Sequence, residues 1–177
     1  MFINPKEVVS NLALSDGMVV GDFGIGTGAF SEEMSKQVGP EGLVYAVDVQ
    51  EPVLKRTQQH FLELGISNVE FIHGNLEDVG GSKIADRTLD LVLLSNIFFQ
   101  VDDDKDLARE ALRTVKVGGR IVVIDWKGPF AGLGPSADLV FTEEKAIKTF
   151  SDLAGAEIVS RLEKVGNYHY GIIFRKK

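Results

Sequence analysis

Short apolar runs alternate with amphipathic, more polar stretches over most of the chain. The apolar runs are rich in Val, Ile and Leu, and such near-continuous apolar character is typical of parallel strands covered on both faces. Five of these strands are expected, at about residues 18–23, 43–49, 69–75, 89–96 and 118–127. Segments with apolar residues at helical spacing predict helices at about residues 5–13, 31–38, 51–64, 105–115 and 142–153.

Two further apolar runs end the sequence, at residues 157–162 and 168–174. The turn at Gly166 and Asn167 is too short for a parallel crossover, so this pair is expected to be antiparallel. The alternation predicts an α/β fold, a doubly wound Rossmann-like sheet that ends in an antiparallel hairpin. Residues 1–177 are expected to form one domain, with residues 1–16 as a short N-terminal helical leader.

Composition and charge narrow the classes of function. The sequence has 177 residues, 44% of them hydrophobic, with a net charge of -7, no cysteine and three scattered histidines. Metal and disulfide chemistry are therefore not expected, and the lack of a basic stripe argues against nucleic acid. No apolar run has membrane-spanning length and no signal peptide is visible, so a cytoplasmic protein is expected.

Residues 18–30 carry the strongest motif: an apolar run, then Asp22, then glycines at positions 24, 26 and 28. This pattern predicts a buried strand that turns sharply into a helix. Glycine is required where the backbone takes a positive φ or lies close to a bound molecule. The free N–H groups at the start of the helix would face that molecule.

Two ligands fit this loop. Gly24, Gly26 and Ala29 match the dinucleotide fingerprint, and Asp48 lies at the right distance to bind a ribose hydroxyl. S-adenosylmethionine would use the same Asp48. Asp22 favours the second ligand, because a carboxylate there would repel a pyrophosphate but attract an ammonium group and a sulfonium.

The segment Val20-Gly-Asp-Phe-Gly-Ile-Gly-Thr-Gly28 resembles the first motif of class I S-adenosylmethionine-dependent methyltransferases. It is most similar to their type 11-like small-molecule branch, which includes quinone-biosynthesis C-methyltransferases and arsenite methyltransferases. The resemblance implies a seven-stranded sheet in the order 3-2-1-4-5-7-6, S-adenosyl-L-methionine as cofactor and a small-molecule methyl acceptor. The arsenite branch relies on cysteines, which this sequence lacks.

Ligands of open α/β sheets lie beyond the carboxyl ends of the strands, where several candidate residues fall. Asp48 is expected to accept hydrogen bonds from both ribose hydroxyls. The resemblance implies that Val49 packs on the adenine, and that Asn75 and the Leu76 N–H bind its edge, although the family commonly has Asp in place of Asn75. The predicted cofactor-binding residues are Asp22, Gly24, Gly26, Gly28, Asp48, Val49, Asn75, Leu76 and Ser95.

The acceptor side is less defined by the sequence. By resemblance, Ser95 and Asn96 end the fourth strand where the methionine part meets the acceptor. Phe99 is a candidate pocket wall, although aromatic residues after a core strand usually belong to the core, and Trp126 is a candidate stacking surface for a flat acceptor. The predicted acceptor-side residues are Asn96, Phe99 and Trp126.

No catalytic residue is assigned. Asp125 and His169 are only weak candidates for a base, and His169 is expected to be structural, in a hairpin far along the sheet. The main hypothesis is a methyltransferase that positions a small-molecule acceptor for in-line displacement at the sulfonium methyl. The alternatives are a catalytically silent S-adenosylmethionine-binding domain, acting as sensor or partner subunit, and an NAD-dependent oxidoreductase. The residues leave the acceptor, the atom methylated and the choice between monomer and homo-oligomer open.

Overall fold

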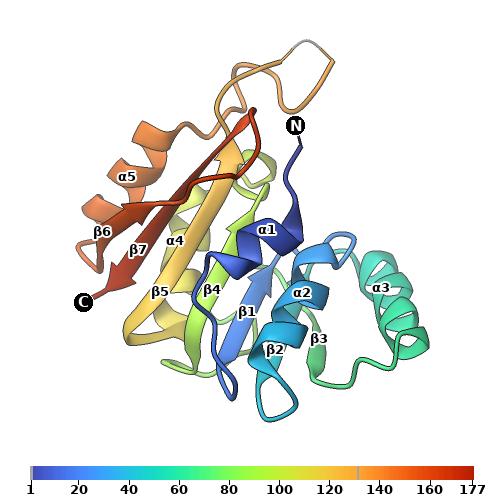
Figure 1. The fold of residues 1–177 in the computed structure, drawn as a ribbon. Helices are drawn as coiled ribbons and strands as arrows, with labels where there is room; N and C mark the ends of the chain where they lie inside the picture. The colour runs from blue at the N-terminus through green and yellow to red at the C-terminus, as the bar shows by residue number, and fades with distance from the viewer. Residues whose placement is uncertain (1, 131) are drawn as a thin grey trace.

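A computed structural model of the protein describes residues 2–130 and 132–177. A seven-stranded sheet crosses the molecule with helices on both faces (Figure 1). The strand order is β3-β2-β1-β4-β5-β7-β6, which confirms the predicted fold. The elements are α1 (Pro5–Ser10), β1 (Val19–Phe23), α2 (Ala29–Val38), β2 (Leu43–Asp48), α3 (Glu51–Glu63), β3 (Val69–His73), β4 (Leu89–Ser95), the short 3-10 helix η1 (Phe98–Gln100), α4 (Asp104–Thr114), β5 (Val115–Trp126), α5 (Glu143–Asp152), β6 (Ala156–Arg161) and β7 (His169–Lys176).

The direction of the strands changes only near the end of the chain. β1 pairs in parallel with β2 on one side and β4 on the other, which makes the gap between β1 and β4 the topological switch point. β7 is antiparallel to both β5 and β6, as expected for a terminal hairpin. Ligands of such sheets lie beyond the carboxyl ends at the switch point, so the fold itself indicates where to look.

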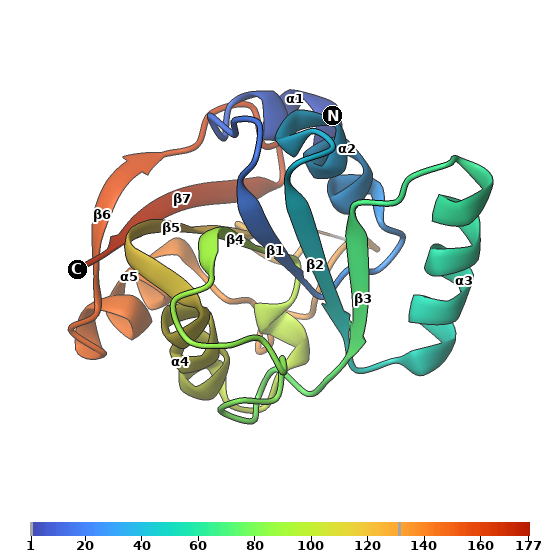
Figure 2. The ribbon, with the colours of Figure 1, turned by 90° about the horizontal axis from the view of Figure 1, so that it is seen from below.

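The sheet is buried on both faces because helices cover both. α1 and α2 lie on one face and α4 and α5 on the other, as Figure 2 shows. α3 packs beside β2 and β3 through Leu54, Ala46 and Phe71. No helix within residues 2–130 and 132–177 is both long and apolar enough to cross a membrane.

Side-chain caps explain where three helices begin. The Asn4 side chain accepts a hydrogen bond from the backbone of α1, Asp103 accepts from two amides of α4, and Thr142 accepts from one amide of α5. These caps satisfy N–H groups that have no partner inside the helix. Within the acidic run before α4, Asp103 therefore acts as a helix cap.

Some predicted boundaries were wrong. The first helix ends at Ser10, about three residues early. β5 begins at Val115 rather than 118, because the chain passes from α4 directly into a strand that pairs with Leu89 across a register shift. His169 does not lie far along the sheet: β7 is the direct neighbour of β5, and His169 is paired with Trp126.

Candidate cofactor and active site

A cleft of about 270 Å³ lies at the carboxyl ends of β1 to β4. Its walls come from the loop after each of these four strands and from the first turn of α3. The lining residues are Gly24, Gly26, Asp48, Val49, Gln50, Val53, Gly74, Asn75, Leu76, Glu77, Asn96, Ile97, Gln100 and Val101. Of the predicted site residues, seven line this cleft: Gly24, Gly26, Asp48, Val49, Asn75, Leu76 and Asn96.

The backbone N–H groups of the glycine loop are largely used inside the protein. They donate to carbonyl or carboxylate oxygens of neighbouring residues: Gly24 and Ile25 to Val47 at 2.8 and 3.2 Å, Gly28 to Ile25 at 2.9 Å, and Gly26 to Asp48 at 3.3 Å. Loops that bind a pyrophosphate direct such groups at the ligand. This loop is therefore better suited to hold a nucleoside by shape than to bind phosphates.

The glycines of the motif have different tasks. Gly28 does not line the cleft: it has a φ of +81°, and a Cβ there would lie 2.5 Å from the side chain of Thr57 and 2.8 Å from Phe61. It therefore allows α3 to pack closely against the start of α2. Gly26 has a φ of +53°, a Cβ there would contact only the Gly24 carbonyl oxygen at 4.0 Å, and the residue forms part of the cleft wall.

Asp22 lies beneath the start of α2, not in the cleft. Its side chain is 2% exposed and accepts hydrogen bonds from the hydroxyl of Ser31 at 2.6 Å and from the Ser31 backbone. Burial raises the pKa of Asp22 to about 7, against the opposing effect of the Ser31 bonds. The Asp22 carboxyl therefore bonds, from inside the protein, to the first turn of α2, where a ligand phosphate would otherwise bind.

Asp48 lies at the cleft wall, where β2 ends. Its carboxylate is 8% exposed; one oxygen accepts from the Gln50 N–H at 2.9 Å and the other from Gly26 at 3.3 Å. These bonds fix the orientation of the carboxylate, and each oxygen keeps a further lone pair for a ribose hydroxyl. Val49 follows with a side chain that is 58% exposed, an apolar surface on which a flat ring can pack.

Asn75 uses its side chain within the protein. Its Nδ2 donates to Asp78 at 3.0 Å and its Oδ1 accepts from the Glu77 N–H at 3.2 Å, so both groups stabilise the turn after β3. Leu76 is buried and contributes to the cleft wall. The position of both residues is as the resemblance implies, but an adenine contact through the Asn75 side chain would require these local bonds to break.

Residues after β4 form the other end of the cleft. Asn96 has a φ of +55°, and among the described residues none gives its buried Oδ1 a hydrogen bond. Ser95 lies just below the cleft without lining it. Phe98 stacks on Phe141 in the core, with ring centroids 4.1 Å apart, and Phe99 is half-buried outside the cleft.

Trp126 and Asp125 lie outside the cleft as well. The indole of Trp126 contacts the imidazole of His169, with ring centroids 4.2 Å apart. Asp125 is fully buried and accepts hydrogen bonds from the Phe98 and Trp126 N–H groups, and burial raises its pKa to about 7. Asp125 therefore holds the segment after β4 against β5 and does not face the cleft.

Seven further residues that line the cleft were not predicted from the sequence. These residues are Gln50, Val53, Gly74, Glu77, Ile97, Gln100 and Val101. All of them come within six residues of a strand end, so the rule that ligands bind beyond carboxyl ends would have found them if it had been applied to whole loops. Glu77 has a further task, since its carboxylate accepts from the Asp102 and Asp103 N–H groups at 2.6 and 3.0 Å.

The electrostatics of the cleft come from two acids, Asp48 and Glu77. In the part of the chain that the structure describes, no group of three or more His, Asp or Glu is arranged to hold a metal ion. The fold and the cleft together define a Rossmann-like domain with a cleft at its switch point and a fixed carboxylate, Asp48, at the end of β2.

Comparison with known proteins supports this class. Residues 14–169 match a family model described as a methyltransferase domain. A crystal structure of a SAM-dependent methyltransferase from Aquifex aeolicus has a TM-score of 0.88 at 28% sequence identity, and the alignment covers 99% of this chain and 91% of that one.

Two curated relatives match the chain over shorter regions. Demethylmenaquinone methyltransferase of Listeria monocytogenes is 32% identical over 124 residues, which are 70% of this chain and 51% of that protein. Arsenite methyltransferase of Aquipseudomonas alcaligenes is 36% identical over 118 residues, 64% of this chain and 34% of that protein. The chain thus spans about half the length, or less, of these relatives.

The chain belongs to the methyltransferase domain family, because the family model matches most of its length. The resemblance inferred from residues 20–28 is confirmed, and so is S-adenosyl-L-methionine as the cofactor of this class.

Proposed function

We propose that this chain transfers a methyl group from S-adenosylmethionine to a small organic acceptor, and that residues 1–177 act as one methyltransferase domain. The observation that carries the proposal is the pairing of Asp48 with the glycine loop. The carboxylate stands at the ribose position of a cleft whose loop amides are bonded within the protein. That arrangement suits a nucleoside without phosphates.

The residues divide the work along the cleft. Asp48 would hold the ribose and Val49 the adenine, both at the β2 end, while Asn96 stands at the β4 end. The bound cofactor supplies a methyl group that its sulfonium sulfur already activates. The protein then has to hold the acceptor in line and exclude water, and positioning of this kind lowers a barrier by several kcal/mol.

The names of the relatives indicate which acceptors to test first. One relative is named for demethylmenaquinone and the other for arsenite. The 177-residue sequence has no cysteine, which is the ligand that binds soft metals and metalloids best. An organic acceptor therefore fits this chain better than arsenite does.

A binding-only role is the second candidate, because one observation favours it. Among the described residues that line the cleft, Asp48 and Glu77 are the only titratable ones, and both already hold backbone amides. Asp48 is assigned to the ribose, and one Glu77 oxygen holds the loop before α4, so no acid of the cleft is dedicated to general-base catalysis. An enzymatic role therefore requires a methyl acceptor that needs no deprotonation, or a base outside the cleft.

Calorimetry and a transfer assay test the proposal. We expect S-adenosylmethionine and S-adenosylhomocysteine to bind at micromolar concentrations, and NAD not to bind. Labelled methyl transfer to a set of quinols, phenols and arsenite then separates the enzyme from a binding-only domain. Binding of NAD without binding of the sulfonium compound would overturn the proposal, and binding without transfer to any acceptor would favour the second candidate.

A further inference from the structure

Aromatic side chains from three separate segments meet at the carboxyl end of β5, outside the cofactor cleft. Trp126 and His169 are paired across β5 and β7, with ring centroids 4.2 Å apart. Phe130 lies 4.7 Å from Tyr168 and 6.4 Å from Trp126, and Phe2 lies 6.1 Å from Tyr168, measured between ring centroids. The five residues come from the N-terminal segment, the β5–α5 connection and the start of β7.

His169 is the buried residue of this aromatic cluster, whereas Trp126 and Tyr168 are partly exposed. His169 is 2% exposed, and within residues 2–130 and 132–177 neither of its ring nitrogens has a hydrogen-bond partner. A neutral imidazole carries one N–H donor and one acceptor nitrogen, and burying both without partners costs stability. Burial and then the nearby charge of Lys127 lower the pKa of His169 to about 4, so the ring is neutral at neutral pH.

The position of the cluster relative to the cleft follows from the sheet. The nucleoside residues Asp48 and Val49 lie at β2, and the cleft ends beyond β4 at Asn96 and Ile97. The next strands are β5 and β7, so His169 lies two strands past β4, roughly 10 Å at ordinary interstrand spacing. An acceptor placed beyond the β4 end of the cofactor would therefore approach the aromatic cluster.

We propose that His169 is the polar anchor of the acceptor site, and that the acceptor is a planar aromatic compound with a hydroxyl group. This inference rests on the proposed methyltransferase function. The hydroxyl would give the acceptor nitrogen of His169 its hydrogen bond, and the ring of the ligand would pack among Trp126, Phe130 and Tyr168. His169 would then be a substrate-binding residue that fixes which edge of the acceptor faces the cofactor.

The surroundings explain the choice of ligand. The walls are aromatic, which suits a flat ring, and the positive charge of Lys127 acts on His169, which disfavours a cationic amine as the acceptor. The backbone of Gly134 lies directly on the indole, since a Cβ at that position would be 2.6 Å from the ring. Because the indole contacts both this backbone and the imidazole, a ligand that packs on Trp126 and bonds His169 changes the environment of the indole.

Trp126 is the only tryptophan in the sequence and reports on this step. The experiment titrates 1-naphthol and 1-methoxynaphthalene, which share a ring system and differ in the hydroxyl, into protein saturated with S-adenosylhomocysteine. Calorimetry gives the affinities, and fluorescence shows whether Trp126 is perturbed. We expect 1-naphthol to bind roughly tenfold more tightly, the effect of one good hydrogen bond.

Two variants and a control identify the residue responsible. His169→Leu should bind both probes equally well, His169→Gln should keep part of the preference, and the exposed-site control His60→Leu should behave like the wild type. His169→Leu should also melt at the same temperature or higher, because it removes a buried polar ring without partners. If His169 had a structural role instead, His169→Leu would melt at a lower temperature than the wild type.

The outcomes separate this inference from the proposed function. If neither probe binds, if His169→Leu keeps the hydroxyl preference, or if that variant melts much lower or fails to fold, the inference is wrong. Calorimetry of His169→Leu with S-adenosylmethionine, which should match the wild type, tests the cofactor site independently. If the wild-type protein does not bind S-adenosylmethionine, the proposed function itself is contradicted.

Discussion

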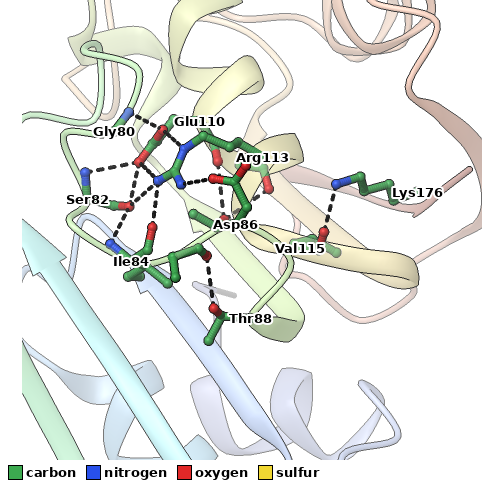
Figure 3. A network of polar contacts seen from close by, with 12 residues as sticks. Gly80, Ser82, Ile84, Asp86, Thr88, Glu110, Arg113, Val115 and Lys176 are labelled. Atoms are coloured by element: carbon green, nitrogen blue, oxygen red, sulfur yellow. Dashed lines mark hydrogen bonds and ion pairs between the residues drawn. The ribbon is translucent and has the colours of Figure 1, made fainter.

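At the amino end of the sheet, buried polar groups are paired in their charged form, whereas at the carboxyl end burial favours their neutral form. Near the amino ends of β4 and β5, the fully buried Glu110 accepts from Arg113, from the Gly80 and Ser82 N–H groups and from the Ser82 hydroxyl (Figure 3). Burial alone would raise the pKa of Glu110, but these bonds outweigh it and lower the pKa to about 2. Arg113 also pairs with Asp86, and the pKa of its guanidinium is raised.

The carboxyl ends carry buried polar groups whose ordinary charge is disfavoured. Burial raises the pKa of Asp22 and Asp125 to about 7, and it lowers the pKa of His169 to about 4. Among the described residues, none bonds the Asn96 Oδ1 or the His169 ring. Groups of this kind gather at functional sites; Asp22 and Asp125 are bonded inside the protein, whereas Asn96 and His169 have polar atoms that a ligand can bond. The amino end therefore serves stability, and the carboxyl end serves binding.

The largest effect is expected at the amino end, for Glu110→Ala. The change leaves Arg113 without its main partner, and breaking a buried pair from one side costs about 3–5 kcal/mol. Urea denaturation measures the loss, while calorimetry should show unchanged affinity for S-adenosylmethionine. Lys36→Ala, which breaks an exposed pair with Glu32, should cost less than about 1 kcal/mol. Equal costs for the two variants would show that the buried Glu110 network stabilises the fold no more than an exposed ion pair does.

Asp22 should give the stability of the protein a pH dependence of unusual sign. Its folded pKa of about 7 exceeds its ordinary value of 3.8, so between these pH values the folded state holds a proton that the unfolded state has released. Stability therefore falls as the pH rises through this window, by at most about 4 kcal/mol for Asp22. Asp22→Asn should flatten the fall, as measured by urea denaturation from pH 4 to 8.

Glu110 gives the opposite pH dependence, which urea denaturation extended down to pH 2 would measure. Its pKa is lowered from 4.5 to about 2, so its contribution is present above pH 4.5 and is lost as the pH falls towards 2. Asp125 acts in the same direction as Asp22, so Asp22→Asn should remove only part of the slope above pH 4. A slope that Asp22→Asn leaves unchanged would show that the Asp22 carboxyl is ionised throughout.

Asp48→Ala should weaken binding of S-adenosylmethionine by roughly 1.5–3 kcal/mol, because a charge-assisted hydrogen bond to the ribose is lost. Calorimetry measures the affinity. Glu51→Ala removes a nearby acid that is exposed and paired with Lys55, and its affinity should match the wild type. Parallel losses in the two variants would point to the general negative charge of this region and not to a ribose contact.

Much of the fold and part of the site could be predicted from the sequence, because their signals are local. The strands follow from apolar runs, the helices from apolar residues at helical spacing, and the motif around Gly24 and Gly26 places the cleft. Asp48 is separated from this motif by one helix and one strand, so its position follows from the same unit. The strand order came from the resemblance and not from periodicity.

The rest depends on contacts between distant residues, which a linear pattern does not contain. Whether Asp22 faces a ligand or a helix depends on Ser31, and whether Asn75 is free depends on Asp78. The sequence predicts His169 far along the sheet, because a linear pattern does not show that the last strand, β7, inserts beside β5. The same insertion brings the imidazole to Trp126.

A small effect on stability is expected at Gly26, the cleft glycine. An alanine Cβ there would have only the Gly24 carbonyl oxygen in contact, at 4.0 Å, but the residue must adopt a φ of +53°, which costs about 1 kcal/mol. Gly28→Ala should cost more, since its Cβ would also collide with Thr57 and Phe61. Relative to the stability that each variant loses, Gly26→Ala should weaken binding of S-adenosylmethionine more than Gly28→Ala does, because of these two glycines only Gly26 lines the cleft. Denaturation and calorimetry on both variants measure the two quantities, and a Gly26→Ala protein with wild-type affinity would place the cofactor away from the glycine loop.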